Sequence, residues 1–394
     1  MSVAIIVDTF PRWSERFIAR ELNELLRRGI DFKIYCLRAG DADCERDPEF
    51  ADLVSLRVVL PSCFLPSFAR NMGLDDAAKE RMRLVESELG VTAFRQIGCA
   101  HSLTKIIREQ RHTIVYAHFA SLPSTLGWLA AAALNLPFVL SCHARDVFVD
   151  AQLLQQKIEY ARRVFTCNKL ALQVFKSRDE QCTKIRYMPH GLPLERFVFS
   201  VRRERSSLGN LKLLSAGRLV PKKGFHNLID ALASQELKEA AIELTIVGDG
   251  PERKALLKRV ERLGLSAVVT MPGVVLDARL QSYFESVDAF VMPSVETGDG
   301  DSDGLPNVVL EAFAIGVPVI GTDAGSLTDV LDATTGFVAS VSPTPVRQLA
   351  LTIREVLMES ERAAERALHA RSVVQERYDI RKNIEPLITE LTQP

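Results

Sequence analysis

Two series of short apolar segments, each alternating with helical patterns, constrain the fold of this chain more than any other feature. The first series has strand-like runs at 3–7, 32–37, 113–116, 137–141, 163–166 and 185–188. The second has them at 211–215, 242–247, 267–270, 288–292, 317–320 and 336–338. The runs of the first series lack a clean alternation of apolar and polar residues, as is typical of strands covered on both faces. The pattern predicts two α/β domains with parallel sheets and right-handed crossovers.

The domain boundary is predicted at a charged stretch, SVRRERSSLGN at 200–210, which is typical of a linker. We therefore expect an N-terminal domain over 1–200 and a C-terminal domain over 201–370. The chain from about 346 onward is helical and charged, and we expect 371–394 to form a helix that packs back on the first domain. Parallel sheets bind ligands at the carboxyl ends of their strands, so a cleft between two facing domains is the expected site.

Composition narrows the class of protein. The 394 residues carry a formal net charge of -1, which argues against a general nucleic-acid binder. The seven cysteines form no C-x-x-C pair, and free thiols in a reducing cytoplasm are the simplest interpretation. The N-terminus lacks the basic segment of a signal peptide. Asn135 and Pro137 interrupt the apolar stretch 124–142, so a buried helix, a turn and a strand are expected there rather than a membrane span.

The segment AGRLVPKKG at 216–224 places two cations just after a predicted strand. Arg218 follows Gly217 directly, and Lys223 lies near the start of the next helix. An arginine can bind two oxygens of a phosphate group and a lysine supplies a mobile point charge, so the pair suits a diphosphate. The alternative is an ordinary basic surface loop.

The segment VGDGPER at 247–253 has the first two glycines of a dinucleotide-binding motif, but Arg253 stands at the third glycine position. The strand that follows does not end in an acidic residue that could hold a ribose. A tight turn between strand and helix is therefore favoured over a pyrophosphate site, and an NAD-dependent oxidoreductase is the weaker alternative.

The segment DGDSDGLPNVVLEA at 299–312 begins like a calcium-binding loop. Counted from Asp299, however, the twelfth position, which needs a bidentate glutamate, holds Leu310. The same residues predict a helix that starts near Pro306, and the free amides of such a start favour phosphate binding. Glu311 lies about one turn into this helix, where it could accept hydrogen bonds from ribose hydroxyls. Asp303 just before it could contact a sugar or cap the helix.

Further candidates lie at strand ends of the first domain. His143 and His118 each lie at the end of a predicted strand. A histidine at such a position is more often structural than catalytic, but two of them in one domain favour a functional role. The loop after the first strand is polar and aromatic and could hold an acceptor. Its candidate acceptor-binding residues are Phe10, Trp13, Glu15 and Arg16, to which we add His118.

Three segments in this order resemble one family: AGRLVPKKG, VGDGPER and SDGLPNVVLEAFAIGVPVIGTDAG. They are similar to the retaining GT-B glycosyltransferases of glycosyltransferase family 4. MPHGLPLERF at 188–197 resembles the segment before the linker in that family, and the N-terminal TFPRWSERFIARELNELLRRGIDFKIYCLR resembles its exopolysaccharide and colanic-acid branch. The resemblance implies two Rossmann-like domains that face a cleft.

The resemblance also implies site residues. The implied catalytic residues are Arg218, Lys223, His143 and Asp303. The implied donor-binding residues are Gly217, Arg218, Lys223, Pro272, Gly273, Val274, Gly304, Leu305, Pro306, Asn307 and Glu311. His143 would lie beside the donor sugar, and the loop from Pro272 would border the base. No metal and no cofactor are implied, because protein cations stabilise the leaving diphosphate.

The resemblance implies a cytoplasmic hexosyltransferase in exopolysaccharide or cell-surface polysaccharide synthesis. Its expected partners are a UDP- or GDP-sugar donor and a saccharide or polyprenyl-diphosphate-linked acceptor, with peripheral membrane contact and without nucleic acid. The chain departs from the family in three places: Asp303 replaces a glutamate, FPRWSERF replaces a Gly-Gly loop, and ETGDGD at 296–301 is inserted. The first departure leaves a non-catalytic nucleotide-sugar-binding protein as an alternative.

Overall fold

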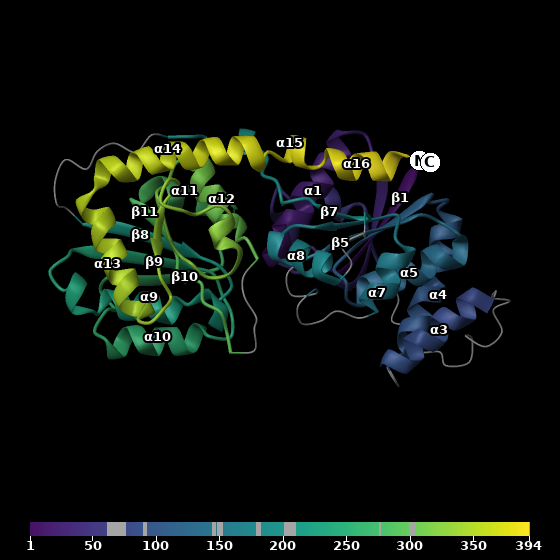
Figure 1. Cartoon of the computed structure of the whole chain (residues 1–394), viewed down its shortest axis with the longest axis horizontal. Helices are drawn as coiled ribbons and strands as arrows, with labels where there is room; N and C mark the ends of the chain where they lie inside the picture. Colours follow the sequence, from purple (N-terminus) through teal and green to yellow (C-terminus); the bar gives the residue numbers. More distant parts are fainter. Residues whose placement is uncertain are drawn as a thin grey trace. The chain divides into compact units, whose positions relative to one another are not determined.

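The structure is a computed structural model that describes residues 1–60, 76–89, 93–143, 147, 153–178, 183–200, 210–275, 277–298 and 304–393. The chain divides into two units. Unit 1 comprises Met1–Gly191 together with Arg381–Pro394, and unit 2 comprises Leu192–Ile380. Each unit is a Rossmann-like domain with one parallel sheet between layers of helices (Figure 1).

The sheet of unit 1 has seven strands in the order β3-β2-β1-β4-β5-β6-β7, and all neighbours are parallel. The strands are β1 (Ser2–Phe10), β2 (Asp31–Ala39), β3 (Arg57–Val59), β4 (Ile114–His118), β5 (Phe138–Cys142), β6 (Arg163–Thr166) and β7 (Ile185–Tyr187). The chain builds outward from β1 to β3 and then resumes at β4 on the other side of β1. Such a reversal creates a crevice at the carboxyl ends of β1 and β4.

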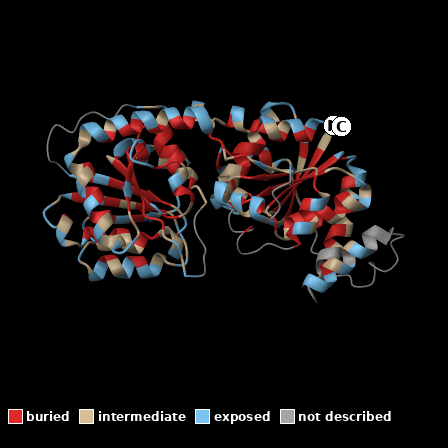
Figure 2. Cartoon of the chain, in the orientation of Figure 1, coloured by how far each residue is buried: buried red, intermediate tan, exposed pale blue. Residues whose placement is uncertain are grey.

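Helices cover both faces of this sheet. They are α1 (Arg16–Arg27), α2 (Ala51–Val54), α3 (Asp76–Leu89), α4 (Ala93–Glu109), α5 (Leu122–Leu134), α7 (Leu154–Tyr160), α8 (Lys169–Arg178), α15 (Ile380–Asn383) and α16 (Glu385–Thr392). The α1 side chains Leu22 and Leu25 and the α16 side chains Leu387 and Leu391 share one apolar core. Residues of α4 and α5 form the core of the opposite face. Figure 2 shows the buried strands between helices whose outer surfaces are exposed.

The apolar stretch 124–142 forms the predicted helix, turn and strand. Helix α5 ends at Leu134, its C-cap Asn135 has a left-handed φ of 52°, and β5 follows from Phe138. Within the described ranges, no helix is long and apolar enough to cross a membrane.

The sheet of unit 2 has six parallel strands in the order β10-β9-β8-β11-β12-β13. The strands are β8 (Leu211–Ala216), β9 (Ile242–Val247), β10 (Val269–Gly273), β11 (Ala289–Met292), β12 (Val319–Thr322) and β13 (Phe337–Ala339). The order reverses between β8 and β11, so the loops after these two strands border the crevice of this sheet.

Two groups of helices bury the faces of the second sheet. Helices α9 (Phe225–Leu232), α10 (Arg253–Arg262) and α13 (Pro345–Met358) share one apolar core. Helices α11 (Asp277–Ser286), α12 (Asn307–Ile315) and α14 (Ser360–Arg377) share the other. Strands β8, β11 and β12 contribute apolar side chains to both cores, which explains why their sequences are continuous apolar runs rather than alternating ones.

The division of the chain differs from the expected boundaries at 200 and 370. Leu192 forms a parallel bridge with Asp379, and Tyr378 is buried in the core that contains α12. These contacts place 192–200 and 371–380 in unit 2. The last residues belong to unit 1, where Arg163 Nε donates to Glu390 Oε1 at 2.6 Å. Residues 201–209 of the expected linker lie outside the described residues.

Candidate active site

The crevice of unit 2 brings together the loop after β8 and the loop that leads from β11 to α12. Gly224, with a φ of +64°, lies so close to the second loop that a Cβ there would fall 1.9 Å from the carbonyl oxygen of Pro293. The amide of Val295 donates to the carbonyl oxygen of Lys222 at 2.8 Å. Glycine is therefore required at 224, and the cationic loop is held against the loop that precedes α12.

Both predicted phosphate-binding cations lie at this crevice edge. Arg218 is exposed and directly follows Gly217, the residue after β8. Lys223 is half-buried, and its Cε would lie 3.4 Å from a Cβ built on Gly217. The aliphatic stem of the lysine thus runs over the glycine, which brings the two cations to the same strand end. This arrangement suits a ligand with adjacent anionic oxygens.

The loops after β9 and β10 are packed beside Gly217. Gly248 has a φ of +136°, and a Cβ there would fall 1.9 Å from the carbonyl oxygen of Gly217. Its amide donates to the carbonyl oxygen of Gly273 at 2.8 Å. Pro272 and Val274 are exposed on either side of Gly273. The residues predicted to border a base therefore adjoin the cationic loop.

Arg253 explains the incomplete dinucleotide motif. Its Nη2 donates to the carbonyl oxygen of Met271 at 2.9 Å, which ties α10 to β10. A structural cation thus occupies the position where the dinucleotide motif requires a glycine.

Helix α12 opens directly at the crevice edge. Pro306 is its N-cap and Asn307 its first residue, so the first amides of the helix have no acceptor within it. Gly304 and Leu305 are half-buried residues of the approach to this helix. Glu311 lies in its second turn, with 4% of its surface exposed. Asp303 and the other aspartates of the calcium-like stretch lie outside the described residues.

The predicted acceptor loop of unit 1 makes extensive internal contacts. Phe10 is buried, and both it and Trp13 pack edge-on against Phe50, with ring centroids 6.0 and 6.2 Å away. Arg16 donates to Asp47 and Glu49, both at 2.7 Å. These residues therefore serve the fold in the structure, and direct contact with an acceptor remains a prediction.

Glu15 in the same loop forms an ion pair of 3.0 Å with Arg12. Burial raises the pKa of the Glu15 carboxyl, and the nearby Arg12 only partly offsets this effect. A carboxyl of this kind is a common feature of binding and catalytic sites.

The two predicted histidines lie together at the carboxyl edge of the unit 1 sheet. His118 ends β4 with no exposed surface, and His143 follows β5 with 7% exposed. Nδ1 of His118 lies 3.5 Å from Nε2 of His143, and Nε2 of His118 lies 3.3 Å from Oε1 of Glu21. Tyr116 donates to the same oxygen of Glu21 at 2.7 Å. His118 is thus placed to position His143, and its predicted acceptor contact would need access that the structure does not show.

His143 adjoins two further residues that the sequence did not single out as site residues, Cys167 and His190. They follow β6 and β7, so the rule that strand ends carry sites could have identified them. Burial and the neighbouring rings of His190 and His118 lower the pKa of His143 well below its usual value. The lowered pKa favours the neutral imidazole at pH 7, in which one ring nitrogen carries a proton and the other a lone pair.

Two family models match the chain in succession. The model described as Glycosyltransferase Family 4 matches residues 14–196, and the model described as Glycosyl transferases group 1 matches residues 200–372. A GDP-mannose-dependent alpha-(1-6)-phosphatidylinositol monomannoside mannosyltransferase of Mycolicibacterium smegmatis is 30% identical over 278 residues, which cover 67% of this chain and 72% of that protein. The chain belongs to the glycosyltransferase family that these two models describe and that includes the mycobacterial relative. The oxidoreductase alternative is therefore set aside.

Two other relatives of this glycosyltransferase are named for the synthesis of bacterial polysaccharides. A putative colanic acid biosynthesis glycosyltransferase, WcaL of Salmonella typhimurium, is 23% identical over 84% of this chain and 85% of its own length. An amylovoran biosynthesis glycosyltransferase, AmsK of Erwinia amylovora, is 26% identical over the same shares.

Solved structures confirm the predicted GT-B fold of the glycosyltransferase. The crystal structure of Anabaena HepE in complex with UDP and glucose matches with a TM-score of 0.74 and 17% identity, over 100% of this chain and 99% of that one. WaaG, a glycosyltransferase involved in lipopolysaccharide biosynthesis, matches with a TM-score of 0.65 and 17% identity over 100% of both chains.

Proposed function

We propose that this glycosyltransferase moves a hexosyl group from a UDP- or GDP-sugar to a lipid-linked saccharide, with retention of configuration, in exopolysaccharide or cell-surface polysaccharide synthesis. The observation that carries the proposal is the crevice of unit 2. There the loop of Arg218 and Lys223 is packed against the loop that leads into α12. The crevice offers two cations and the amino-terminal end of α12 to a diphosphate, and the Glu311 carboxylate is the proposed acceptor for ribose hydroxyls.

The chemical role of the cations follows from the charge that develops during transfer. The acceptor oxygen bonds to the anomeric carbon, while the bond from that carbon to the phosphate oxygen breaks and its electron pair leaves with the diphosphate. Arg218 and Lys223 would stabilise that charge without reorganising, which lowers the barrier. The departing phosphate can take the proton of the acceptor hydroxyl, and attack on the same face would retain the configuration. His143 remains a predicted catalytic residue.

Relatives support both candidate donors and the class of acceptor. The mycobacterial relative is named for GDP-mannose and for a phosphatidylinositol monomannoside, whereas HepE was solved with UDP and glucose. The WcaL and AmsK names concern colanic acid and amylovoran. We infer a glycolipid acceptor, which would require peripheral contact with a membrane.

The role of Glu311 can be tested by a substitution that keeps its shape. Glu311→Gln removes a charged acceptor of two ribose hydroxyl hydrogen bonds, and hydrogen bonds to charged groups are worth about 1.5–3 kcal/mol. We expect the dissociation constant of the donor to rise about 10–150-fold, measured by isothermal titration calorimetry. Glu361→Gln, at an exposed position of α14, is the matched control and should bind like the wild type. Equal affinity of both variants would contradict the ribose contact.

The proposed activity is tested in two steps with the full chain. Thermal unfolding is first recorded with a panel of UDP- and GDP-sugars, because a ligand at 100 times its Kd stabilises the folded state by about 2.7 kcal/mol. We expect one nucleotide series to raise the Tm and the free nucleotide diphosphate to compete. The stabilising donor is then incubated with glycolipid acceptors, and the anomeric configuration of the product is read by NMR.

The outcomes separate the alternatives. Release of UDP or GDP with an α-linked product from an α-linked donor supports a retaining transferase. Donor binding without hydrolysis or transfer would favour the non-catalytic nucleotide-sugar-binding protein. No stabilisation by any nucleotide-sugar would refute the proposed function.

A further inference from the structure

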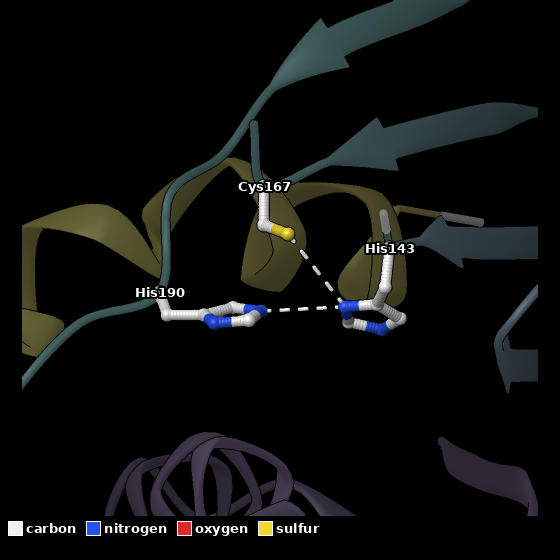
Figure 3. Close-up of side chains that lie close together, drawn as sticks. All are labelled: His143, Cys167 and His190. Carbon is white, nitrogen blue, oxygen red and sulfur yellow. Dashed lines mark hydrogen bonds between the residues drawn. The ribbon is translucent and has the colours of Figure 1, made fainter. Parts of the chain in front are cut away.

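Three side chains of unit 1 converge at the carboxyl ends of β5, β6 and β7 (Figure 3). They are His143, Cys167 and His190, and their ligand atoms all lie within 4.8 Å of one another. Nδ1 of His143 lies 3.3 Å from Nε2 of His190 and 3.7 Å from Sγ of Cys167. His190 and Cys167 thus both face Nδ1 of His143, a nitrogen that has only one lone pair and can accept only one strong hydrogen bond.

These separations match those between ligands of a tetrahedral metal ion. With Zn–N bonds of about 2.0–2.1 Å and a Zn–S bond of about 2.3 Å, two nitrogens lie about 3.3–3.4 Å apart and nitrogen and sulfur about 3.5–3.6 Å apart. The two distances from His143 Nδ1 are close to these values. The ligand atoms of the remaining pair, Cys167 and His190, lie within 4.8 Å of each other, so metal binding would require these two side chains to move closer together.

Neighbouring residues orient the ligands as they do in known metal sites. The other ring nitrogen of His143, Nε2, faces Nδ1 of His118, which in turn lies beside the Glu21 carboxylate. If Nε2 of His143 donates its proton to Nδ1 of His118, Nδ1 of His143 is the lone-pair nitrogen and faces Cys167 and His190. His190 is fixed differently, since its ring stacks on Phe17 with centroids 4.0 Å apart and an interplanar angle of 8°.

The three side chains of the cluster are partly shielded from solvent but not fully enclosed, as a metal-binding site requires. His143 is buried, whereas Cys167 and His190 are half-buried, so an ion can reach the three ligands from the surface. Two imidazoles and a thiolate are borderline-soft ligands that suit Zn²⁺ and disfavour Mg²⁺ or Ca²⁺.

We propose that His143, Cys167 and His190 form a binding site for one Zn²⁺ ion, with a fourth position open to water. Binding replaces the thiol proton of Cys167 by a sulfur–metal bond, and the proton passes to solvent. All three ligands belong to unit 1, and the proposed transfer uses the cations of unit 2 rather than a metal ion to stabilise the diphosphate. Because His143 is a predicted catalytic residue, the bound ion is expected to slow transfer.

The site can be tested on the full reduced chain with Co²⁺, a spectroscopic substitute for Zn²⁺. We expect one tetrahedral Co²⁺ per chain, with visible d–d bands, a thiolate charge-transfer band in the near ultraviolet, and displacement by Zn²⁺. Cys167→Ser should abolish the charge-transfer band. Cys167→Ser and His190→Gln should each weaken binding by at least about 100-fold, since even the residues that orient a ligand contribute about 10–100-fold. Cys99→Ser and His369→Gln, outside the cluster, are the matched controls.

A second measurement uses the wild-type protein and does not depend on how the variants fold. Zn²⁺ should protect Cys167 from alkylation by iodoacetamide, as read by mass spectrometry of the peptide that contains it. Octahedral Co²⁺ spectra, unchanged binding in both ligand variants, or unchanged alkylation of Cys167 would each overturn the proposal. None of these measurements uses a sugar donor, so their failure is distinct from failure of the proposed transferase.

Discussion

Replacing Arg218 or Lys223 with alanine is expected to lower kcat for sugar transfer by about 10²–10³-fold each. Each cation lies at the carboxyl end of β8, where the leaving diphosphate is proposed to bind. The loss corresponds to about 2.7–4 kcal/mol of transition-state stabilisation, because the charge on the diphosphate is greatest when the glycosidic phosphate bond breaks. Release of nucleotide diphosphate at saturating donor is the measurement.

Lys212→Ala is the matched control for this experiment. Lys212 is an exposed cation near the amino end of the same strand, at the opposite edge of the sheet. Its removal changes the net charge equally but leaves the crevice intact, so kcat should stay at the wild-type level. If all three variants turned over alike, the cations of the β8 loop would not be the groups that stabilise the leaving diphosphate.

Arg16→Ala is expected to destabilise unit 1 by about 3–5 kcal/mol, because it breaks a buried ion pair from one side. The guanidinium of Arg16 pairs with Asp47 and Glu49, whose side chains are 0% and 1% exposed. Glu49 keeps its pair with Arg20, but Asp47 loses the cation beside it. Urea unfolding followed by tryptophan fluorescence measures the change in unit 1 alone, since both tryptophans, at 13 and 128, lie in that unit.

Arg12→Ala provides the comparison from the same loop. Arg12 is 41% exposed and pairs with Glu15 alone, whereas Arg16 pairs with two fully buried carboxylates, so the loss of Arg12 should destabilise unit 1 less than the loss of Arg16. If Arg16→Ala left stability unchanged and only raised the KM for the acceptor, the ion cluster would be unimportant for folding. That result would support the acceptor role predicted for Arg16 instead.

Local pattern was sufficient for most of the secondary structure. The strands at 163–166 and 242–247 have the predicted bounds, and the others differ by one to a few residues at their ends. The exception is β3, which the sequence analysis did not predict. It has only three residues and lies at the sheet edge, where Val59 is 44% exposed. A three-residue, partly exposed strand has too short an apolar pattern to be predicted from the sequence.

The domain boundaries could not be read from local pattern because long-range burial sets them. The charged stretch at 200–210 suggests a linker, but Leu192 already pairs with Asp379 in unit 2. Those residues are far apart in sequence, and only the folded chain brings them together. The packing of α16 could not be predicted either: its apolar leucines predict a buried face, but only the folded chain shows that this face packs in the same core as α1.

The sequence by itself determined the family, the two parallel sheets and the cations of the β8 loop, because these depend on residue types at short, fixed spacings. Tertiary structure decided which of those residues meet. It put Lys223 over Gly217, made Phe10 and Arg16 part of the unit 1 scaffold, and gathered His143, Cys167 and His190 from three strand ends. No short spacing encodes that last cluster, since parallel strands align their carboxyl ends only once the sheet has formed.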